Sequence, residues 1–235
     1  MHLLIDIGNT QAKFASYNSD NKIDVINAEK ALSMLQNCLS VVVSSVASNE
    51  QSDKVLAQAK LTGVPITHVT VSNVEFGIQC AYENFATLGV DRWLAVLAAE
   101  KCFPNTPVLV VDAGTALTID ALSDHKQHLG GWIIPGLKLM QQSIVDKAPG
   151  VFISDNQNNQ EFGTSTPAAV FNGCKHTCVA AIVHARAKLE KMSNNGVQVK
   201  VVMTGGDAST LQTELPFESQ LIKELVFIGL ARFIK

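Results

Sequence analysis

The fold of this chain is decided by residues 108–120, VLVVDAGTALTID. An apolar run long enough for a strand buried on both faces ends at Asp112, and a second strand with alternating side chains follows the turn at Gly114 and Thr115. The carboxylate could hold a hydrated cation, while the backbone N–H groups and the threonine hydroxyl of the turn could face a phosphate. An ordinary hairpin turn is the competing explanation, because Asp and Gly are common there too.

The same pattern opens the chain, in residues 3–14, LLIDIGNTQAKF. Asp6 and Gly8 follow an apolar strand with the spacing of Asp112 and Gly114, and a second strand is predicted over 11–17. We therefore expect two halves, each with a phosphate turn, that face one nucleotide from opposite sides. Chance similarity of two hairpins is the alternative.

Composition limits the class of protein. The chain has 235 residues, of which 47% are hydrophobic and 17% charged, as expected for one large or two small well-packed globular domains. The net charge of −3 argues against sequence-independent binding of nucleic acid, which needs a basic face. No apolar run approaches the ~18–20 residues of a membrane span, so no membrane partner is expected.

The cysteines and the first ten residues indicate the compartment. Residues 1–10, MHLLIDIGNT, have no basic segment ahead of a short apolar run that Asp6 interrupts, so a signal peptide is not predicted. The five cysteines form no paired framework, which favours the reducing cytoplasm. A metal site at Cys174, His176 and Cys178 is rejected, because the two cysteines share a helix face from which the histidine points away.

The first half is predicted to begin with a three-strand meander and to continue with alternating helices and strands. This order resembles a ribonuclease-H-like half, in which a right-handed crossover makes strand 66–69 parallel to strand 41–46. Residues 75–90 are predicted to be rich in loops. The predicted strands are 2–7, 11–17, 22–27, 41–46 and 66–69, and the predicted helices are 31–38, 49–62 and 92–101.

The second half repeats the meander and then carries a long helix with an apolar stripe. The predicted strands are 107–112, 115–122, 127–134 and 199–203, and the predicted helices are 137–146, 166–192 and 218–234. The stripe consists of Val170, Cys174, Cys178, Ala181, Val183 and Leu189. It either packs on its own sheet or, because several of its residues are small, approaches a second copy across a two-fold axis.

Five short motifs follow one another between residues 6 and 207. They are Asp6-x-Gly8-Asn9-Thr10-x-x-Lys13, Gly89-x-Asp91-Arg92, Asp112-Ala113-Gly114-Thr115-Ala116, Gly130-Gly131-x-Ile133-x-Pro135-Gly136 and Thr204-Gly205-Gly206-Asp207. Each motif is unspecific alone, but in this order they resemble the type III pantothenate kinases, a family of the acetate-and-sugar-kinase, heat-shock ATPase and actin superfamily.

The resemblance implies an α/β actin-like ATPase fold. It consists of two ribonuclease-H-like half-domains, residues 1–106 and 107–235, with a cleft between them, and it allows the last helix to pack back on the first half. It also implies ATP-dependent phosphorylation of pantothenate to 4′-phosphopantothenate, the first step of coenzyme A synthesis, in a cytoplasmic homodimer with sites at its interface.

The resemblance also assigns roles to residues. Asp91 would be the catalytic base, Asp6 would hold magnesium through water, and Asp112 would bind a monovalent cation, potassium or ammonium. The implied ATP-binding residues are Asp6, Gly8, Asn9, Thr10, Lys13, Thr115, Gly205 and Gly206. The implied pantothenate-binding residues are Tyr82, Gly89, Val90, Asp91, Arg92 and, from the dimer partner, Thr166. Of the two interpretations of the apolar stripe, the resemblance favours a dimer interface.

Two alternatives stay open. A non-catalytic regulatory or transcription accessory protein can keep the same fold, since fold does not determine function. Loss of Asp6, Asp91 or Asp112 would indicate such a protein, and all three are present. Another small-molecule kinase of the superfamily, acting on a sugar or a carboxylic acid, is the second alternative.

Overall fold

The computed structural model describes residues 1–8, 10–47, 50–154, 161–193 and 197–234. It divides the chain into two compact units. Unit 1 contains residues 1–102, 126–128 and 224–235, and unit 2 contains residues 103–125 and 129–223. The sequence-based division places the boundary between residues 106 and 107.

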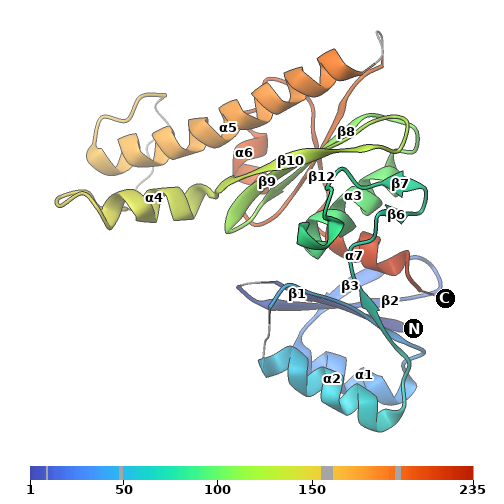
Figure 1. Cartoon of the computed structure of the whole chain (residues 1–235). Helices are drawn as coiled ribbons and strands as arrows, with labels where there is room; N and C mark the ends of the chain where they lie inside the picture. Colours follow the sequence, from blue (N-terminus) through green and yellow to red (C-terminus); the bar gives the residue numbers. More distant parts are fainter. Residues whose placement is uncertain (9, 48–49, 155–160, 194–196, 235) are drawn as a thin grey trace. The chain divides into compact units, whose positions relative to one another are not determined.

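Unit 1 is built on a five-stranded sheet in the order β3-β2-β1-β4-β5 (Figure 1). β1, β2 and β3 form the predicted antiparallel meander, and β4 and β5 are parallel to β1, which confirms the predicted crossover. The strands are β1 (His2–Ile7), β2 (Ala12–Tyr17), β3 (Ile23–Ile26), β4 (Val41–Ser45) and β5 (Ile66–Val69). The apolar runs of β1 and β4 are buried on both faces, as expected for central strands of a layered α/β unit.

Helices cover both faces of this sheet. α1 (Ala28–Met34), the 3₁₀ turn η1 (Leu35–Asn37) and α2 (Glu50–Thr62) pack on one face (Figure 1). α3 (Val90–Cys102) and α7 (Leu225–Ala231) pack on each other and contact β4 on the other face. α7 approaches α3 closely, because a Cβ on Gly229 would stand 2.3 Å from the carbonyl oxygen of Leu94.

A short hairpin and a turn complete unit 1 ahead of α3. β6 (Val74–Glu75) pairs with β7 (Ile78–Gln79), and η2 (Phe85–Thr87) follows. The prediction that residues 75–90 are rich in loops is confirmed, although the sequence did not predict these two-residue strands.

Unit 2 repeats the sheet order of unit 1, as β10-β9-β8-β11-β12. β8 pairs with β9 antiparallel and with β11 parallel, just as β1 pairs with β2 and β4. The strands are β8 (Val108–Ala113), β9 (Ala116–Leu122), β10 (His128–Pro135), β11 (Lys200–Thr204) and β12 (Gln220–Leu221). The shared order confirms the α/β class with two similar halves that the repeated Asp-x-Gly pattern predicts.

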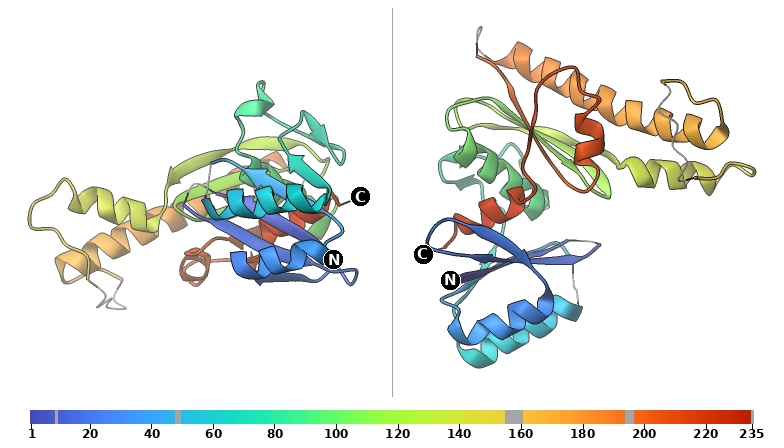
Figure 2. Two further views of the ribbon diagram at one scale, coloured as in Figure 1. Left: turned by 90° about the horizontal axis from the view of Figure 1, so that it is seen from below. Right: turned by 180° about the vertical axis from the view of Figure 1, so that it is seen from behind.

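The helices of unit 2 are α4 (Leu137–Val145), α5 (Thr166–Met192) and α6 (Ala208–Gln212). α5 and α6 pack on the sheet, and α4 runs beside the first part of α5, beyond the end of the sheet (Figure 2). The core joins Cys178, Ile182 and Leu189 of α5 to side chains of β8, β9 and β11. In the described part of the chain, no helix has both the length and the apolarity that crossing a membrane requires.

Two helix predictions are wrong in their limits. The helix predicted over 31–38 begins at Ala28, because the side chain of Asn27 accepts a hydrogen bond from the Lys30 N–H and caps it, and it becomes a 3₁₀ turn after Met34. The helix predicted over 218–234 is confined to α7, since residues 220–221 join the sheet as β12 instead.

Candidate active site

Asp6 lies at the carboxyl end of β1, where three strands of unit 1 meet. Its neighbour on β4 is Ser44, whose Oγ donates a hydrogen bond to Asp6 Oδ1 at 3.0 Å. Its neighbour on β2 is Lys13, which is exposed. The register therefore places the predicted Asp6 and Lys13 side by side, as a phosphate site with a cation partner requires.

The electrostatics of Asp6 have several sources. Burial raises the pKa of its carboxyl group above the ordinary value, the Ser44 hydrogen bond opposes this rise, and the negative charge of Asp91 adds to it. The positive charge of Lys13 acts in the opposite direction. The charge of Asp91 therefore acts on Asp6 within unit 1, so the predicted metal ligand and the predicted base lie near each other.

The turn after β1 closes through a backbone hydrogen bond. The N–H of Gly8 donates to the carbonyl of Gln11 at 3.1 Å, which leaves the exposed Thr10 within the turn. Asn9, the other predicted residue of this turn, lies outside the described residues. Gly8 and Thr10 are thus the described residues of the predicted phosphate turn.

Asp91 stands in the first turn of α3, as predicted. Its Oδ1 accepts the backbone N–H of Arg92 at 2.8 Å, and the helix dipole stabilises a carboxylate at this position. Gly89 passes so close that a Cβ there would lie 2.5 Å from Asp91 Oδ1. The capping role and a role as a base are compatible, because the hydrogen bond occupies only one of the two carboxylate oxygens.

Arg92 and Tyr82 form a pair beside Asp91. Arg92 Nη1 donates to the Tyr82 hydroxyl at 3.0 Å, and the guanidinium carbon lies 5.8 Å from the centre of the tyrosine ring. The side chain of Val90 is buried, so a contact with substrate would come from its backbone. Five of the six predicted substrate residues therefore gather at the start of α3.

In unit 2, Asp112 lies at the carboxyl end of β8, in the place that Asp6 has in unit 1. Its parallel neighbour on β11 is Thr204. The following Gly205 has a φ of +95°, and a Cβ on it would lie 2.5 Å from Asp112 Oδ1. Glycine is required here both for the backbone conformation and for the close approach to the carboxylate.

The turn at Gly114 and Thr115 is held by two neighbouring segments. The N–H of Gly136 donates to the Thr115 carbonyl at 3.0 Å, and that of Asp207 donates to the Ala113 carbonyl at 3.0 Å. Thr115 is exposed, and a Cβ on Gly206 would meet no atom within 4 Å. Unit 2 thus brings four predicted residues together at turns with free space beside Gly206. These residues are Asp112, Thr115, Gly205 and Gly206.

These donors suit the implied ligands. Asp6 and Asp112 offer carboxylate oxygens, which hard cations prefer, and the glycine turns leave room for phosphate oxygens to approach the backbone. Among the described residues, no group of three or more His, Cys, Asp or Glu could hold a metal ion.

Thr166 is the first residue of α5 and is exposed. The preceding Ser165 caps the helix by accepting the N–H of Ala168, and a Cβ on Gly163 would lie 2.2 Å from the backbone nitrogen of Ala169. Thr166 therefore stands at a fixed helix start, on a different element from the Asp112 cluster.

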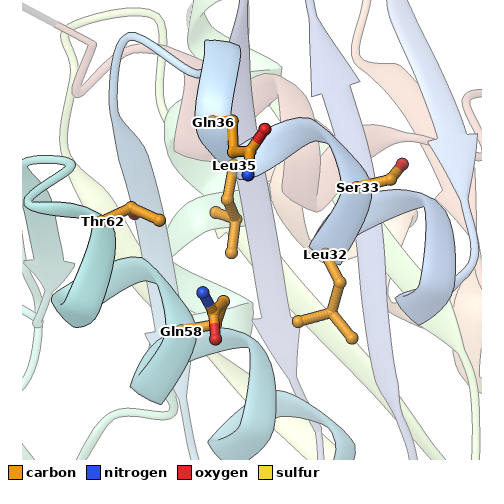
Figure 3. Close-up of a pocket in the computed structure, with 6 residues that line it drawn as sticks. All are labelled: Leu32, Ser33, Leu35, Gln36, Gln58 and Thr62. Atoms are coloured by element: carbon orange, nitrogen blue, oxygen red, sulfur yellow. The ribbon is translucent and has the colours of Figure 1, made fainter.

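A separate groove of about 460 Å³ lies between α1, η1 and α2 on the helix layer of unit 1 (Figure 3). Its lining offers amide and hydroxyl groups and aliphatic side chains, with no ionisable group for phosphoryl transfer. The lining residues are Leu32, Ser33, Leu35, Gln36, Gln58 and Thr62.

One site residue, Ser44, is not among those that the sequence singles out. Ser44 contacts Asp6 through the parallel register of β1 and β4, and its only sequence signal is a pair of serines at the end of an apolar strand. Asp207 lies within a quoted motif, yet its backbone contact with Ala113 depends on how β8 and β11 pair.

Comparison with known proteins identifies the same family by sequence. Residues 2–188 match the family model described as type III pantothenate kinase. A type III pantothenate kinase of Pseudoalteromonas translucida is 35% identical over 98% of this chain and 94% of its own length. One of Colwellia psychrerythraea is 30% identical over 99% of this chain and 100% of its own length.

Solved structures give the same fold. A conserved putative Baf family transcriptional activator from Campylobacter jejuni has a TM-score of 0.62 and 25% identity, covering 98% of this chain and 96% of that one. A putative 2-dehydro-3-deoxygalactonokinase from Sinorhizobium meliloti has a TM-score of 0.56 at 12% identity, covering 99% and 97%. The second likeness concerns the fold alone.

Proposed function

This chain belongs to the type III pantothenate kinase family, and from this membership we propose that it transfers the γ-phosphoryl group of ATP to pantothenate. The product is 4′-phosphopantothenate, in the first step of coenzyme A synthesis, and we place the reaction in the cytoplasm. The observation that carries the proposal is the position of Asp91 beside Arg92, with Asp6 close enough for the two carboxylates to interact.

Asp91 is the general base in this proposal. Its carboxylate takes the proton of the pantothenate hydroxyl, the hydroxyl oxygen attacks the γ-phosphorus, and the bond to the β–γ bridging oxygen breaks to release ADP. Arg92 suits the carboxylate of pantothenate, because a guanidinium binds a carboxylate through two parallel hydrogen bonds. The Tyr82 hydroxyl orients that guanidinium by accepting one of its N–H groups.

The two phosphate turns hold ATP. The proposed ATP-binding residues of unit 1 are Lys13 and the turn at Gly8 and Thr10, and those of unit 2 are Thr115 and the Gly205-Gly206 turn. Asp6 would hold magnesium through water and Asp112 would hold a monovalent cation, and these ions would supply positive charge beside the phosphates. Phosphoryl transfer needs little more than such positioning and charge stabilisation.

A coupled kinase assay with pantothenate, ATP and magnesium tests the proposal and its cation together. We expect turnover in potassium or ammonium, collapse of the rate in sodium, and recovery when either cation is restored. Equal rates in the three salts would contradict the proposal that Asp112 binds a monovalent cation. Turnover of a sugar or another carboxylic acid in place of pantothenate would favour a different kinase of the superfamily.

A non-catalytic regulator is the second candidate, because the Campylobacter jejuni protein is described as a putative transcriptional activator. That description belongs to the relative. In this chain Asp6, Asp91 and Asp112 are all present, so the catalytic proposal keeps the preference. Absence of any kinase turnover in a folded, magnesium-loaded protein would reverse it.

We also propose a homodimer with sites at its interface, supported by apolar side chains exposed on unit 2. They lie on β10, on α4 and in the segment between α4 and α5, and monomeric surfaces seldom gather so many. These residues are Trp132, Ile133, Leu139, Ile144, Phe152, Ile153 and Phe162.

The surface of α5 that is open to a second copy is not the apolar stripe that the family resemblance favoured as the interface. Cys178 lies in the core of unit 2 and Cys174 is buried, so the stripe packs on its own unit and is not available to a second copy. The exposed face of α5 carries other small residues, namely Ala169, Gly173, Thr177 and Ala180. These permit close approach of a second helix near Thr166.

Gly173→Arg is expected to give a folded monomer with little activity, because a Cβ at Gly173 meets no atom within 4 Å and the new side chain would stand only in the way of a partner. Sedimentation or light scattering measures the mass. Ala57→Arg, at an exposed alanine of α2, is the matched control and should leave the mass of a dimer. A dimeric Gly173→Arg protein would move the interface elsewhere, and a fully active monomer would exclude shared sites.

A further inference from the structure

Residues 126–128 belong to unit 1 and are fastened there at several points. The backbone N–H of Gln79 donates to the Lys126 carbonyl at 2.9 Å, and Gln79 and Gln127 form a parallel bridge. Lys126 Nζ lies 2.8 Å from Glu100 Oε1. The segment is thus held both by its backbone and by its first side chain.

The carboxylate that holds Lys126 is itself fixed. Glu100 is buried, and its Oε2 accepts a hydrogen bond from Arg232 Nη1 at 3.0 Å. The Arg232 guanidinium carbon lies 4.1 Å from the centre of the Phe76 ring. Because a buried carboxylate with two cationic partners has little freedom to move, the segment that ends in His128 has a defined position.

His128 is fully buried and contacts the loop that carries Tyr82. Its ring stacks on the Tyr82 ring with 6.2 Å between centres and 14° between planes. The backbone N–H of Ala81 donates to Nδ1 at 3.5 Å. The Trp93 ring packs edge-on at 6.0 Å between centres, so the imidazole contacts both the Tyr82 loop and α3.

Tyr82 connects His128 to Arg92. The tyrosine hydroxyl accepts the Arg92 Nη1 hydrogen bond on the one side, and its ring lies against His128 on the other. The Arg92 side chain is also buried, so its guanidinium has few alternative positions. A change at His128 therefore reaches the guanidinium through one intervening ring.

We propose that His128 is a positioning residue for the acceptor substrate, which sets the affinity for pantothenate by holding Tyr82 against Arg92. The proposal rests on the proposed function, in which Arg92 binds the pantothenate carboxylate. His128 is fully buried behind Tyr82, so in this proposal it acts through that residue. Because its contacts run to Tyr82 and the start of α3, its effect is selective for pantothenate over ATP.

His128→Leu tests this role, since leucine fills a similar volume without a flat ring or an acceptor nitrogen. The KM for pantothenate should rise by about three- to tenfold, the range that corresponds to one aromatic contact, while kcat and the KM for ATP stay within about twofold. His128→Phe keeps a flat ring and should restore most of the affinity. Melting temperatures verify that each variant is folded.

A double-mutant cycle separates positioning through Tyr82 from general loss of structure. In a Tyr82→Ala background, His128→Leu should add nothing to the KM for pantothenate, because the residue through which it acts is gone. The same rise as in the wild-type background would overturn the proposal, and so would equal rises of both KM values or an unchanged KM in folded His128→Leu. A wild-type protein without pantothenate turnover would instead refute the proposed function.

Discussion

Asp91→Asn is expected to leave the fold intact and to lower kcat by roughly 10²–10⁴-fold, the range typical of removing a general base. The amide keeps an oxygen that can accept the Arg92 N–H, so the first turn of α3 retains its capping hydrogen bond. It cannot take the proton of the pantothenate hydroxyl. Steady-state kinetics with both substrates saturating measures the loss, and circular dichroism verifies the helix content.

Asp53→Asn is the matched control for this experiment. Asp53 is an exposed carboxylate in the first turn of α2, far in sequence from the candidate site, and its replacement should leave kcat unchanged. An Asp91→Asn protein that turns over within a few fold of the wild type would assign Asp91 to helix capping alone.

Asp6→Asn is expected to lower turnover by about 10²-fold or more while making the protein more stable at neutral pH. The loss of turnover follows from removing a charge that positions magnesium beside the phosphates. The gain in stability follows from the raised pKa of the Asp6 carboxyl, since burial disfavours the charged form and an amide carries no charge. The Ser44 hydroxyl can still donate to the amide oxygen.

The sign of the pH dependence follows from that raised pKa. The folded state binds the Asp6 proton more tightly than the unfolded state, whose value is near 3.8, so this contribution stabilises the fold at low pH. It is lost as the pH rises from the unfolded to the folded pKa, and it stays constant above that. Melting temperatures across this range should therefore favour Asp6→Asn increasingly as the pH rises, before the difference levels off.

Asp20→Asn is the control for the stability measurement, because Asp20 is an exposed carboxylate in the turn after β2. Its melting temperature should follow that of the wild type at every pH. An Asp6→Asn protein that melts below the wild type at neutral pH would mean that the carboxylate stabilises the fold, contrary to the effect of burial.

The sequence predicted the strands and long helices where the pattern is local. The runs at Val108 and Leu3 fix β8 and β1, and the spacing of apolar residues fixes α5. The sequence did not predict strand β12, because residues 220–221 become a strand only by pairing with Val202 and Met203. No local pattern reveals that contact. A two-residue strand also carries too little alternation to distinguish it from a helix start.

The candidate site was predictable where one motif supplies several residues. Asp91 and Arg92 are neighbours in the chain, so their proximity needs no knowledge of the fold. Ser44 and His128 reach the site through strand register and through a segment fastened to Glu100, and a lone serine or histidine gives no signal of that. Tertiary contacts of this kind are set by packing across the whole unit.

Unit 1 takes its last elements from the far end of the chain, because residues 224–235 supply α7. During synthesis on the ribosome, α3 therefore emerges long before the helix that covers it. Until then the backbone of Leu94, against which Gly229 later packs, has no α7 beside it. Unit 2 can complete its sheet first, so maturation of the helix that bears Asp91 waits for the final segment to be translated.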